Sequence, residues 1–152
     1  MVIKRVYPRF LFSRPEYDRL RVQYTKESGV KLWGGSKTDP RDYDDTKMIV
    51  ALEGEVLVGF SCIRLIKHPH YVNATIASMD AIYLEPSSRK GGAGLKLLNE
   101  ARAYAHDCGA ESLIMSAPYG SRLAKMLRVL FRDDPVQEVF CIGTDIRKGK
   151  RK

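Results

Sequence analysis

The chain has 152 residues, of which 44% are hydrophobic and 29% are charged, so it can bury one core and is too apolar to be disordered. Its apolar runs stop well short of the roughly 18 residues that a membrane-spanning helix needs. The first residues, Met1–Arg5, lack the apolar segment of a signal peptide. We therefore expect a cytoplasmic protein that has no membrane partner.

The cysteines and the charge distribution narrow the class of protein further. Cys62, Cys108 and Cys141 are far apart and odd in number, so they predict neither a disulfide framework nor a zinc site. The formal charge is +8, but five of the positive charges lie in Arg147–Lys152, and the remainder is only +3. Nucleic-acid contact is therefore expected only through this tail, which has no aromatic residue for base stacking. We expect one domain over residues 1–146, followed by a basic tail at 147–152.

The first half of the chain predicts three strands and one helix. Ser13 and Glu16 have capping-box spacing at the start of an apolar helix face. Glu53-Gly54-Glu55 lies between two apolar runs and is typical of a hairpin turn. In chain order we expect a strand at Val2–Tyr7, a helix from Ser13 to Gly29, a polar loop at Gly34–Lys47, and strands at Met48–Glu53 and Val56–Ile66.

The second half alternates strands with helices. The expected elements are a strand at Thr75–Leu84, a helix at Gly92–Cys108, a strand at Ser112–Ser116, a helix at Ser121–Phe131 and a strand at Gln137–Ile146. The last helix should turn an apolar face that includes Leu130 and Phe131 toward the core. Strands joined by short turns pair antiparallel, whereas a helix between strands indicates a parallel crossover. The fold class is α/β, with a mixed, mostly antiparallel sheet of about six strands and helices on both faces.

The turn Arg89-Lys90-Gly91-Gly92-Ala93-Gly94 connects an expected strand to an expected helix. Glycines let backbone amides approach a ligand, and a helix start carries partial positive charge, so this design suits a phosphate. Neither common nucleotide motif fits: no GxxxxGK[ST] run exists, and Leu97 stands at the third glycine of GxGxxG. The alternative is that the glycines serve only a tight strand-to-helix turn.

The same turn resembles the [RQ]xxGx[GA] coenzyme A signature of the GNAT acyltransferases, through Arg89, Gly92 and Gly94. The strand ending Ile82–Pro86 and the hairpin Glu53–Phe60 also resemble that family, so the resemblance covers roughly Met48 to Phe131. It implies a GNAT-like sheet with a central splay. It also implies acetyl-CoA (coenzyme A) as co-substrate and no metal.

The resemblance further implies how the co-substrate would be held. The main chain of Ile82 and Leu84 would pair with the pantetheine arm, which requires the strands at Thr75–Leu84 and Ser112–Ser116 to splay apart. The side chains of Arg89 and Lys90 would strengthen the attraction. The backbone amides expected to hold the pyrophosphate are those of Lys90, Gly91, Gly92, Ala93, Gly94 and Leu95.

Two residues are candidates for the chemistry that the resemblance implies. Asp80 is the candidate base, and strand alternation would place it on the same face as Ile82 and Leu84. Asp80 is equally well interpreted as an aspartate paired with a nearby Lys or Arg. The tyrosine acid of the family is replaced by Arg128, so Tyr119 is the candidate acid, or else a packed loop aromatic.

The acceptor is the least defined part of the prediction. The loop after the first helix contains four aspartates that would attract a cationic amine or be merely solvated, namely Asp39, Asp42, Asp44 and Asp45. Trp33 lines that site or anchors the loop. We expect an N-acetyltransferase that acts on a primary amine (small molecule, polyamine or protein amine) by direct attack, as a monomer or homodimer. The alternative is an inactive GNAT-fold binding or structural protein that contacts nucleic acid through its tail.

Overall fold

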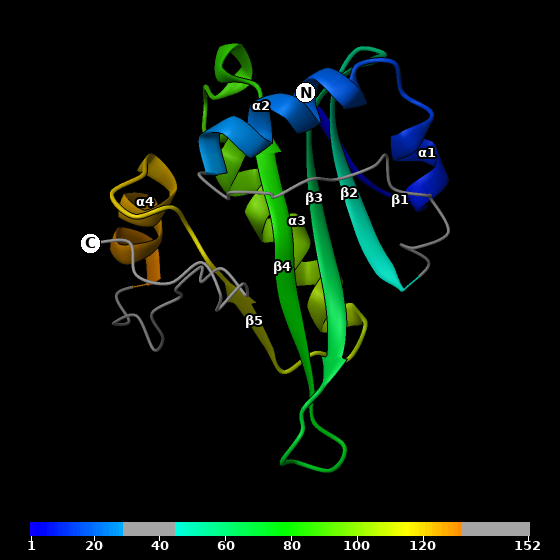
Figure 1. Ribbon diagram of the computed structural model, residues 1–152, viewed down its shortest axis with the longest axis vertical. Coiled ribbons are helices and arrows are strands. Elements are labelled where there is room, and N and C mark those ends of the chain that lie inside the picture. The colour runs from blue at the N-terminus through cyan, green and yellow to red at the C-terminus, as the bar shows by residue number, and fades with distance from the viewer. Residues whose placement is uncertain (29–44, 132–152) are drawn as a thin grey trace, which may run out of the picture.

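The computed structural model describes residues 1–28 and 45–131, which form one five-stranded sheet with helices on both faces (Figure 1). The strand order is β1-β2-β3-β4-β5, and every pair is antiparallel except the parallel pair β4–β5. The strands are β1 (Val2–Val6), β2 (Thr46–Glu53), β3 (Val56–Lys67), β4 (Thr75–Leu84) and β5 (Ser112–Met115). The helices are α1 (Pro8–Phe12), α2 (Tyr17–Ser28), α3 (Ala93–Asp107) and α4 (Arg122–Phe131), with a short 3-10 turn η2 (Pro86–Ser88).

This architecture confirms the predicted mixed sheet. The expected sixth strand at Gln137–Ile146, the basic tail and most of the aspartate loop with Trp33 lie outside the described residues. Asp45 is described, and it is exposed beside the start of β2. Within residues 1–28 and 45–131, no helix combines the length and the apolar character that crossing a bilayer requires.

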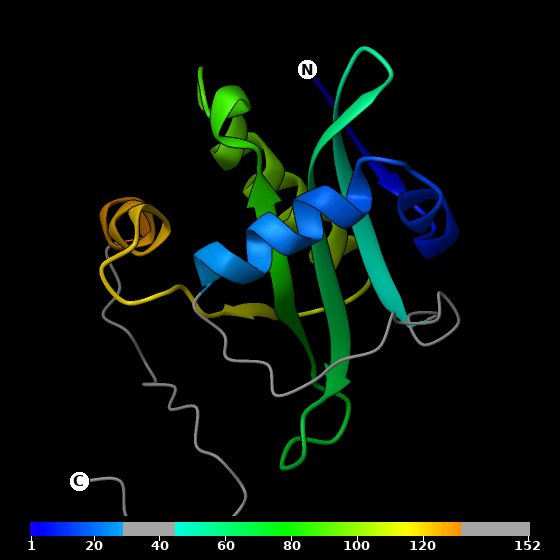
Figure 2. The ribbon, with the colours of Figure 1, turned by 45° about the horizontal axis from the view of Figure 1, so that its top comes forward.

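Three buried clusters fill the two sides of the sheet, one on the side of α2 and two on the side of α3. Helix α2 crosses the front of the strands (Figure 2), and beneath it Leu20 and Phe60 are buried with side chains from α1 and β2. Helix α3 covers the other side, where Leu97 and Leu98 pack against Ile63. Because strand side chains alternate between faces, β1, β2, β3 and β4 each contribute to both sides, whereas β5 contributes Leu113 and Met115 to the side under α3. We call the side under α2 the α2 face and the side under α3 the α3 face.

The start of the first long helix was predicted wrongly. Ser13 does not cap it, because the Ser13 hydroxyl donates to the Phe10 carbonyl at 2.9 Å. A short helix, α1, precedes it, and Pro8 stands in the first turn of α1, where a missing N–H costs nothing. Helix α2 then begins at Tyr17.

The last described helix, α4, begins as predicted but packs less than predicted. The Ser121 hydroxyl accepts a hydrogen bond from the Ala124 amide at 3.1 Å, which is a standard N-cap. No residue of α4 is fully buried, and Leu130, expected to face inward, is 42% exposed. Helix α4 contacts the α3-face cluster through Met126, Leu127 and Phe131.

Candidate functional site

The turn between β4 and α3 takes a backbone conformation that only glycine adopts cheaply. Gly91 has φ +58° and Gly92 has φ +74°, both in the left-handed region. Gly92 is the N-cap of α3 and provides no side chain to cap it. The local sequence therefore determines the shape of this turn, as expected from its two adjacent glycines.

The turn leaves a set of backbone amides unpaired at the start of α3. Ala93, also predicted to contribute, instead donates its amide to the Lys90 carbonyl at 3.1 Å. Since α3 begins here, the remaining amides carry the partial positive charge of the helix start. Among the described residues, no protein acceptor pairs with the amides of Lys90, Gly91, Gly92, Gly94 and Leu95.

Gly94 indicates that the space beyond these amides is open. It lies in the first turn of α3 without a positive φ, where glycine is less stable than alanine by about 1 kcal/mol. A Cβ placed on Gly94 would meet no heavy atom within 4 Å. Neither the backbone nor packing of the described chain requires glycine here, so the residues present fit an anionic group lying close against the helix start.

Arg89, expected to strengthen the attraction of the turn for an anion, has contacts within the protein, and that expected role stays a prediction. Its Nε donates to the Leu84 carbonyl at 2.6 Å, and its Nη2 pairs with Glu27 of α2 at 2.7 Å. Its guanidinium also lies 5.4 Å from the centre of the Tyr83 ring. Arg89 therefore ties the turn to β4 and α2, and the Glu27 carboxylate offsets its charge. Lys90 is exposed and forms no ion pair within the described part of the chain.

The predicted splay lies beside this turn and is confirmed (Figure 1). Pairing between β4 and β5 runs from Ile76 with Ser112 to Met79 with Met115 and then ends. The Glu85 amide donates to the Val58 carbonyl at 2.8 Å, which fixes the alternation of the β3–β4 ladder.

By that alternation Ile82 and Leu84 direct their backbone groups away from β3, toward the edge that β5 has left. Arg89 already occupies the Leu84 carbonyl. The open groups at this edge are thus both backbone groups of Ile82 and the amide of Leu84. Their edge continues directly into the turn that carries the unpaired amides.

A β-bulge interrupts β4 at Asp80. Cys62 pairs with Ala81 and Ile63 with Met79, so Asp80 is an extra residue without a partner on β3. The prediction that Asp80 shares a face with Ile82 and Leu84 is therefore wrong. Asp80 pairs with Arg64 and belongs to the α2 face, whereas Ile82 and Leu84 pack with residues of the α3 face.

Asp80 lies among polar groups from three elements. Its Oδ2 accepts from Nη2 of Arg64 at 2.5 Å, and its Oδ1 lies 3.5 Å from the Ser78 hydroxyl. The Tyr24 hydroxyl donates to the Asp80 carbonyl at 3.1 Å. Burial, and to a lesser extent the nearby Cys62 and Asp80, raises the pKa of Tyr24, so its hydroxyl stays protonated at neutral pH.

The sequence did not identify Arg64 or Tyr24 as neighbours of Asp80. Tyr24 falls within the helix expected from Ser13 to Gly29, and Arg64 falls within the strand expected at Val56–Ile66. The paired-aspartate interpretation of Asp80 describes the ion pair that the structure contains. Its role as a base is a matter of reactivity and stays a prediction.

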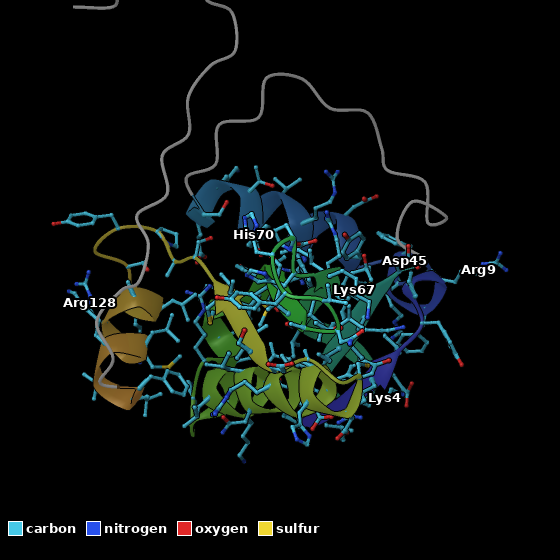
Figure 3. All side chains as sticks on the ribbon, turned by 90° about the horizontal axis from the view of Figure 1, so that it is seen from below. Lys4, Arg9, Asp45, Lys67, His70 and Arg128 are labelled. Carbon is cyan, nitrogen blue, oxygen red and sulfur yellow. The ribbon has the colours of Figure 1, made fainter. Side chains whose placement is uncertain are left out.

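The candidate acid Tyr119 lies away from Asp80 and the turn. Tyr119 is 98% exposed in the connection between β5 and α4. Arg128, which stands where the family has tyrosine, points away from the sheet (Figure 3). His68 and His70 lie in the β3–β4 connection with ring centroids 6.0 Å apart. No group of three or more metal ligands occurs among the residues that the structure describes.

A cavity of 240 Å³ lies against the turn, and none of its walls comes from β4. The turn itself supplies Lys90, Gly91 and Ala93 to its lining, and Ile3 of β1, Glu53 and Lys96 line its other walls. This cavity is therefore distinct from the edge formed by Ile82 and Leu84.

Comparison with known proteins assigns the family. Residues 11–128 match the acetyltransferase (GNAT) family, which is most of the chain, so this protein belongs to that family. A comparison with curated protein sequences finds no match.

Solved structures of acetyltransferases share the fold. A ribosomal-protein-alanine N-acetyltransferase from Brucella melitensis biovar Abortus 2308 aligns with TM-score 0.67 and 16% identity, over 94% of this chain and 99% of the other. An aminoglycoside acetyltransferase from an uncultured soil metagenomic sample, in complex with sisomicin, aligns with TM-score 0.68 and 16% identity over 93% of each chain. An aminoglycoside N-acetyltransferase in complex with CoA aligns with TM-score 0.67 and 12% identity, over 94% and 98%. At these identities the likeness concerns the fold alone.

Proposed function

We propose that this protein transfers an acetyl group from acetyl-CoA to a primary amine. The observation that carries the proposal is the continuity of two sets of open backbone groups, one at Ile82 and Leu84 and the other at the start of α3. The unpaired strand edge suits the amide-containing pantetheine arm, and the amides beyond it suit the pyrophosphate. Family membership supports the same pairing of ligand and site.

Acetyl-CoA supplies the acetyl group as a thioester, whose C–S bond breaks as a C–N bond to the amine forms. The residues proposed to hold it are Ile82 and Leu84, the turn shaped by Arg89, and the amides of Lys90, Gly91, Gly92, Gly94 and Leu95. The Ala93 amide, already bonded to Lys90, contributes only by shaping the turn.

Asp80 is proposed as the base that takes the proton from the acceptor amine. A lysine-like ammonium has a pKa of about 10.4, so deprotonating it at neutral pH costs roughly 4–5 kcal/mol. The Asp80 side chain is 28% exposed, and only one of its oxygens bonds to Arg64. The bulge turns this carboxylate toward the α2 face close to the end of the β4–β5 pairing.

The departing sulfur needs a proton, and two tyrosines are candidates to donate it. Tyr119, the candidate from the sequence, would have to turn inward from its 98% exposed position. Tyr24 has the better supported position, because its hydroxyl already bonds to the Asp80 main chain.

Measuring coenzyme A release with a panel of amines tests the proposal. Asp80→Asn should lower kcat about 100-fold or more, which is the usual contribution of a general base, while leaving the Kd for acetyl-CoA close to that of the wild type. Asp107→Asn is the matched control, because Asp107 also pairs with an arginine, at 2.7 Å to Arg5, but lies on α3. An equal loss of activity in both variants would contradict the assignment of Asp80.

A second candidate function is binding of coenzyme A without transfer. The observation that favours it is the arginine at position 128 together with the exposure of Tyr119. Saturable binding of acetyl-CoA by calorimetry, with no release of coenzyme A across peptides, polyamines and small amines, would support this function over catalysis. Salt-sensitive nucleic-acid binding that is lost on deleting residues 147–152 would add the proposed auxiliary contact through the tail.

A further inference from the structure

A row of polar side chains crosses the α2 face next to the bulge. Thr46 of β2, Arg64 of β3 and Ser78 of β4 are direct partners in the strand register. Asp80, turned toward the same face by the bulge, adds a carboxylate to this row. The neighbouring row on the same face is apolar and includes Met48 and Cys62. The polar row therefore marks a defined place for a charged ligand beside the proposed base.

The ion pair within this row can be opened at little cost. The side chains of Arg64 and Asp80 are 57% and 28% exposed. Exposed pairs of this kind contribute only about 0–1 kcal/mol. An ammonium group that approaches Asp80 can therefore take the place of the guanidinium.

Opening the pair leaves Arg64 without a partner anion. A guanidinium has five N–H donors in a planar arrangement that matches a carboxylate. Among the described residues, only the bond from Nη2 to Asp80 uses one of these donors. An acceptor that is a pure polycation would leave this charge unpaired and would be repelled by it. An acceptor with its own carboxylate would pair with both side chains.

We propose that Arg64 and Asp80 together recognise an acceptor that carries a carboxylate next to its amine, such as an α-amino acid. Asp80 receives the ammonium group and Arg64 receives the carboxylate, so that one internal ion pair is exchanged for two with the ligand. This inference rests on the proposed acetyl transfer and names the substrate class of that same site. Charge-assisted hydrogen bonds of this kind correspond to a preference of about tenfold to a hundredfold over the same amine without its carboxylate.

The test compares amino acids with their decarboxylated amines as acceptors for the full chain and acetyl-CoA. Suitable pairs are lysine with cadaverine, arginine with agmatine, and phenylalanine with phenethylamine. The wild type should show a kcat/KM at least about tenfold higher for the amino acid of a pair. Arg64→Gln should remove this preference mainly through KM, and Arg64→Lys should restore part of it.

Arg5→Gln is the matched control, because Arg5 also forms ion pairs at 2.7 Å, with Glu100 and Asp107 on α3. It should keep the preference of the wild type. Acetyl-CoA binding and thermal unfolding, measured on each variant, separate loss of recognition from loss of folding. A merely structural role for Arg64 would lower activity on both members of a pair alike.

The possible outcomes separate this inference from the proposed function. Turnover that favours the decarboxylated amines, or a preference that survives in Arg64→Gln, overturns the inference and leaves the acetyltransferase function standing. Absence of coenzyme A release with every amine contradicts the proposed function, and the inference fails with it.

Discussion

The two halves of β4 differ in the kind of groups that they present. Its C-terminal part, Ala81–Leu84, leads into the turn before α3 and offers backbone amides and carbonyls. We call this part, with the turn, the backbone half. Its other part is centred on the Asp80 bulge, where side chains from α2, β3 and β4 come together. We call this part the side-chain half. In the function proposed above, the backbone groups hold the parts that every acyl-coenzyme A shares, and the side chains select the amine. On this proposal a single strand carries a general binding function at one end and a specific one in its middle.

The first prediction concerns a substitution that disrupts the backbone half. Gly92→Glu should weaken acetyl-CoA binding at least about a hundredfold, because a carboxylate would lie among the amides proposed for the pyrophosphate and φ +74° would strain the turn. Isothermal titration calorimetry measures the Kd. Gly109→Glu is the matched control, since Gly109 has φ +83° and open space around it at the opposite end of α3. Equal weakening in both variants would mean that strain alone explains the loss.

The second prediction concerns the side-chain half and asks which tyrosine acts as the acid. Tyr24→Phe should lower kcat by about tenfold or more, because it removes the hydroxyl that donates to the Asp80 carbonyl. Tyr119→Phe should change kcat by less, given that Tyr119 is 98% exposed. Steady-state kinetics at saturating acetyl-CoA distinguish the two. The reverse order of effects would assign the acid to Tyr119.

The third and smallest prediction concerns Cys62, which is buried below the bulge. Burial, with a further contribution from Asp80, raises the pKa of this thiol from 9.0 to about 12. The folded state therefore retains a proton that the unfolded state releases. The resulting stability is fully present below about pH 9 and is lost as the pH rises toward 12, by at most about 1.4 kcal/mol per pH unit.

Urea unfolding of the wild type and of Cys62→Ala between pH 8 and pH 11 measures this dependence. Cys62→Ala should show a shallower fall in unfolding free energy with pH than the wild type. Cys108→Ala, at a half-buried position, should retain the dependence of the wild type. The same slope in all three proteins would place the titrating group elsewhere.

The backbone half could be predicted from the sequence because its interactions are local. The glycines at 91 and 92 shape their own turn through their positive φ angles. The strands at Val56–Lys67 and Thr75–Leu84 follow from their apolar runs.

The side-chain half depends on contacts between distant segments. Arg64 lies 16 residues from Asp80, Tyr24 lies 56 residues away, and Glu27 lies 62 residues from Arg89. The bulge itself follows from how β3 pairs with β4, which strand periodicity alone does not reveal. For this reason the face of Asp80 and the partner of Arg89 emerged only from the structure.

The most direct test of the proposed coenzyme A site is a titration of the 15N-labelled full chain with coenzyme A, followed by the chemical shifts of its backbone amides. We expect the largest shifts at the open amides of β4 and the turn: Ile82, Leu84, Lys90, Gly91, Gly92, Gly94 and Leu95. Shifts confined to the cavity residues outside the turn, such as Ile3, Glu53 and Lys96, or no shifts at all, would contradict the proposed site.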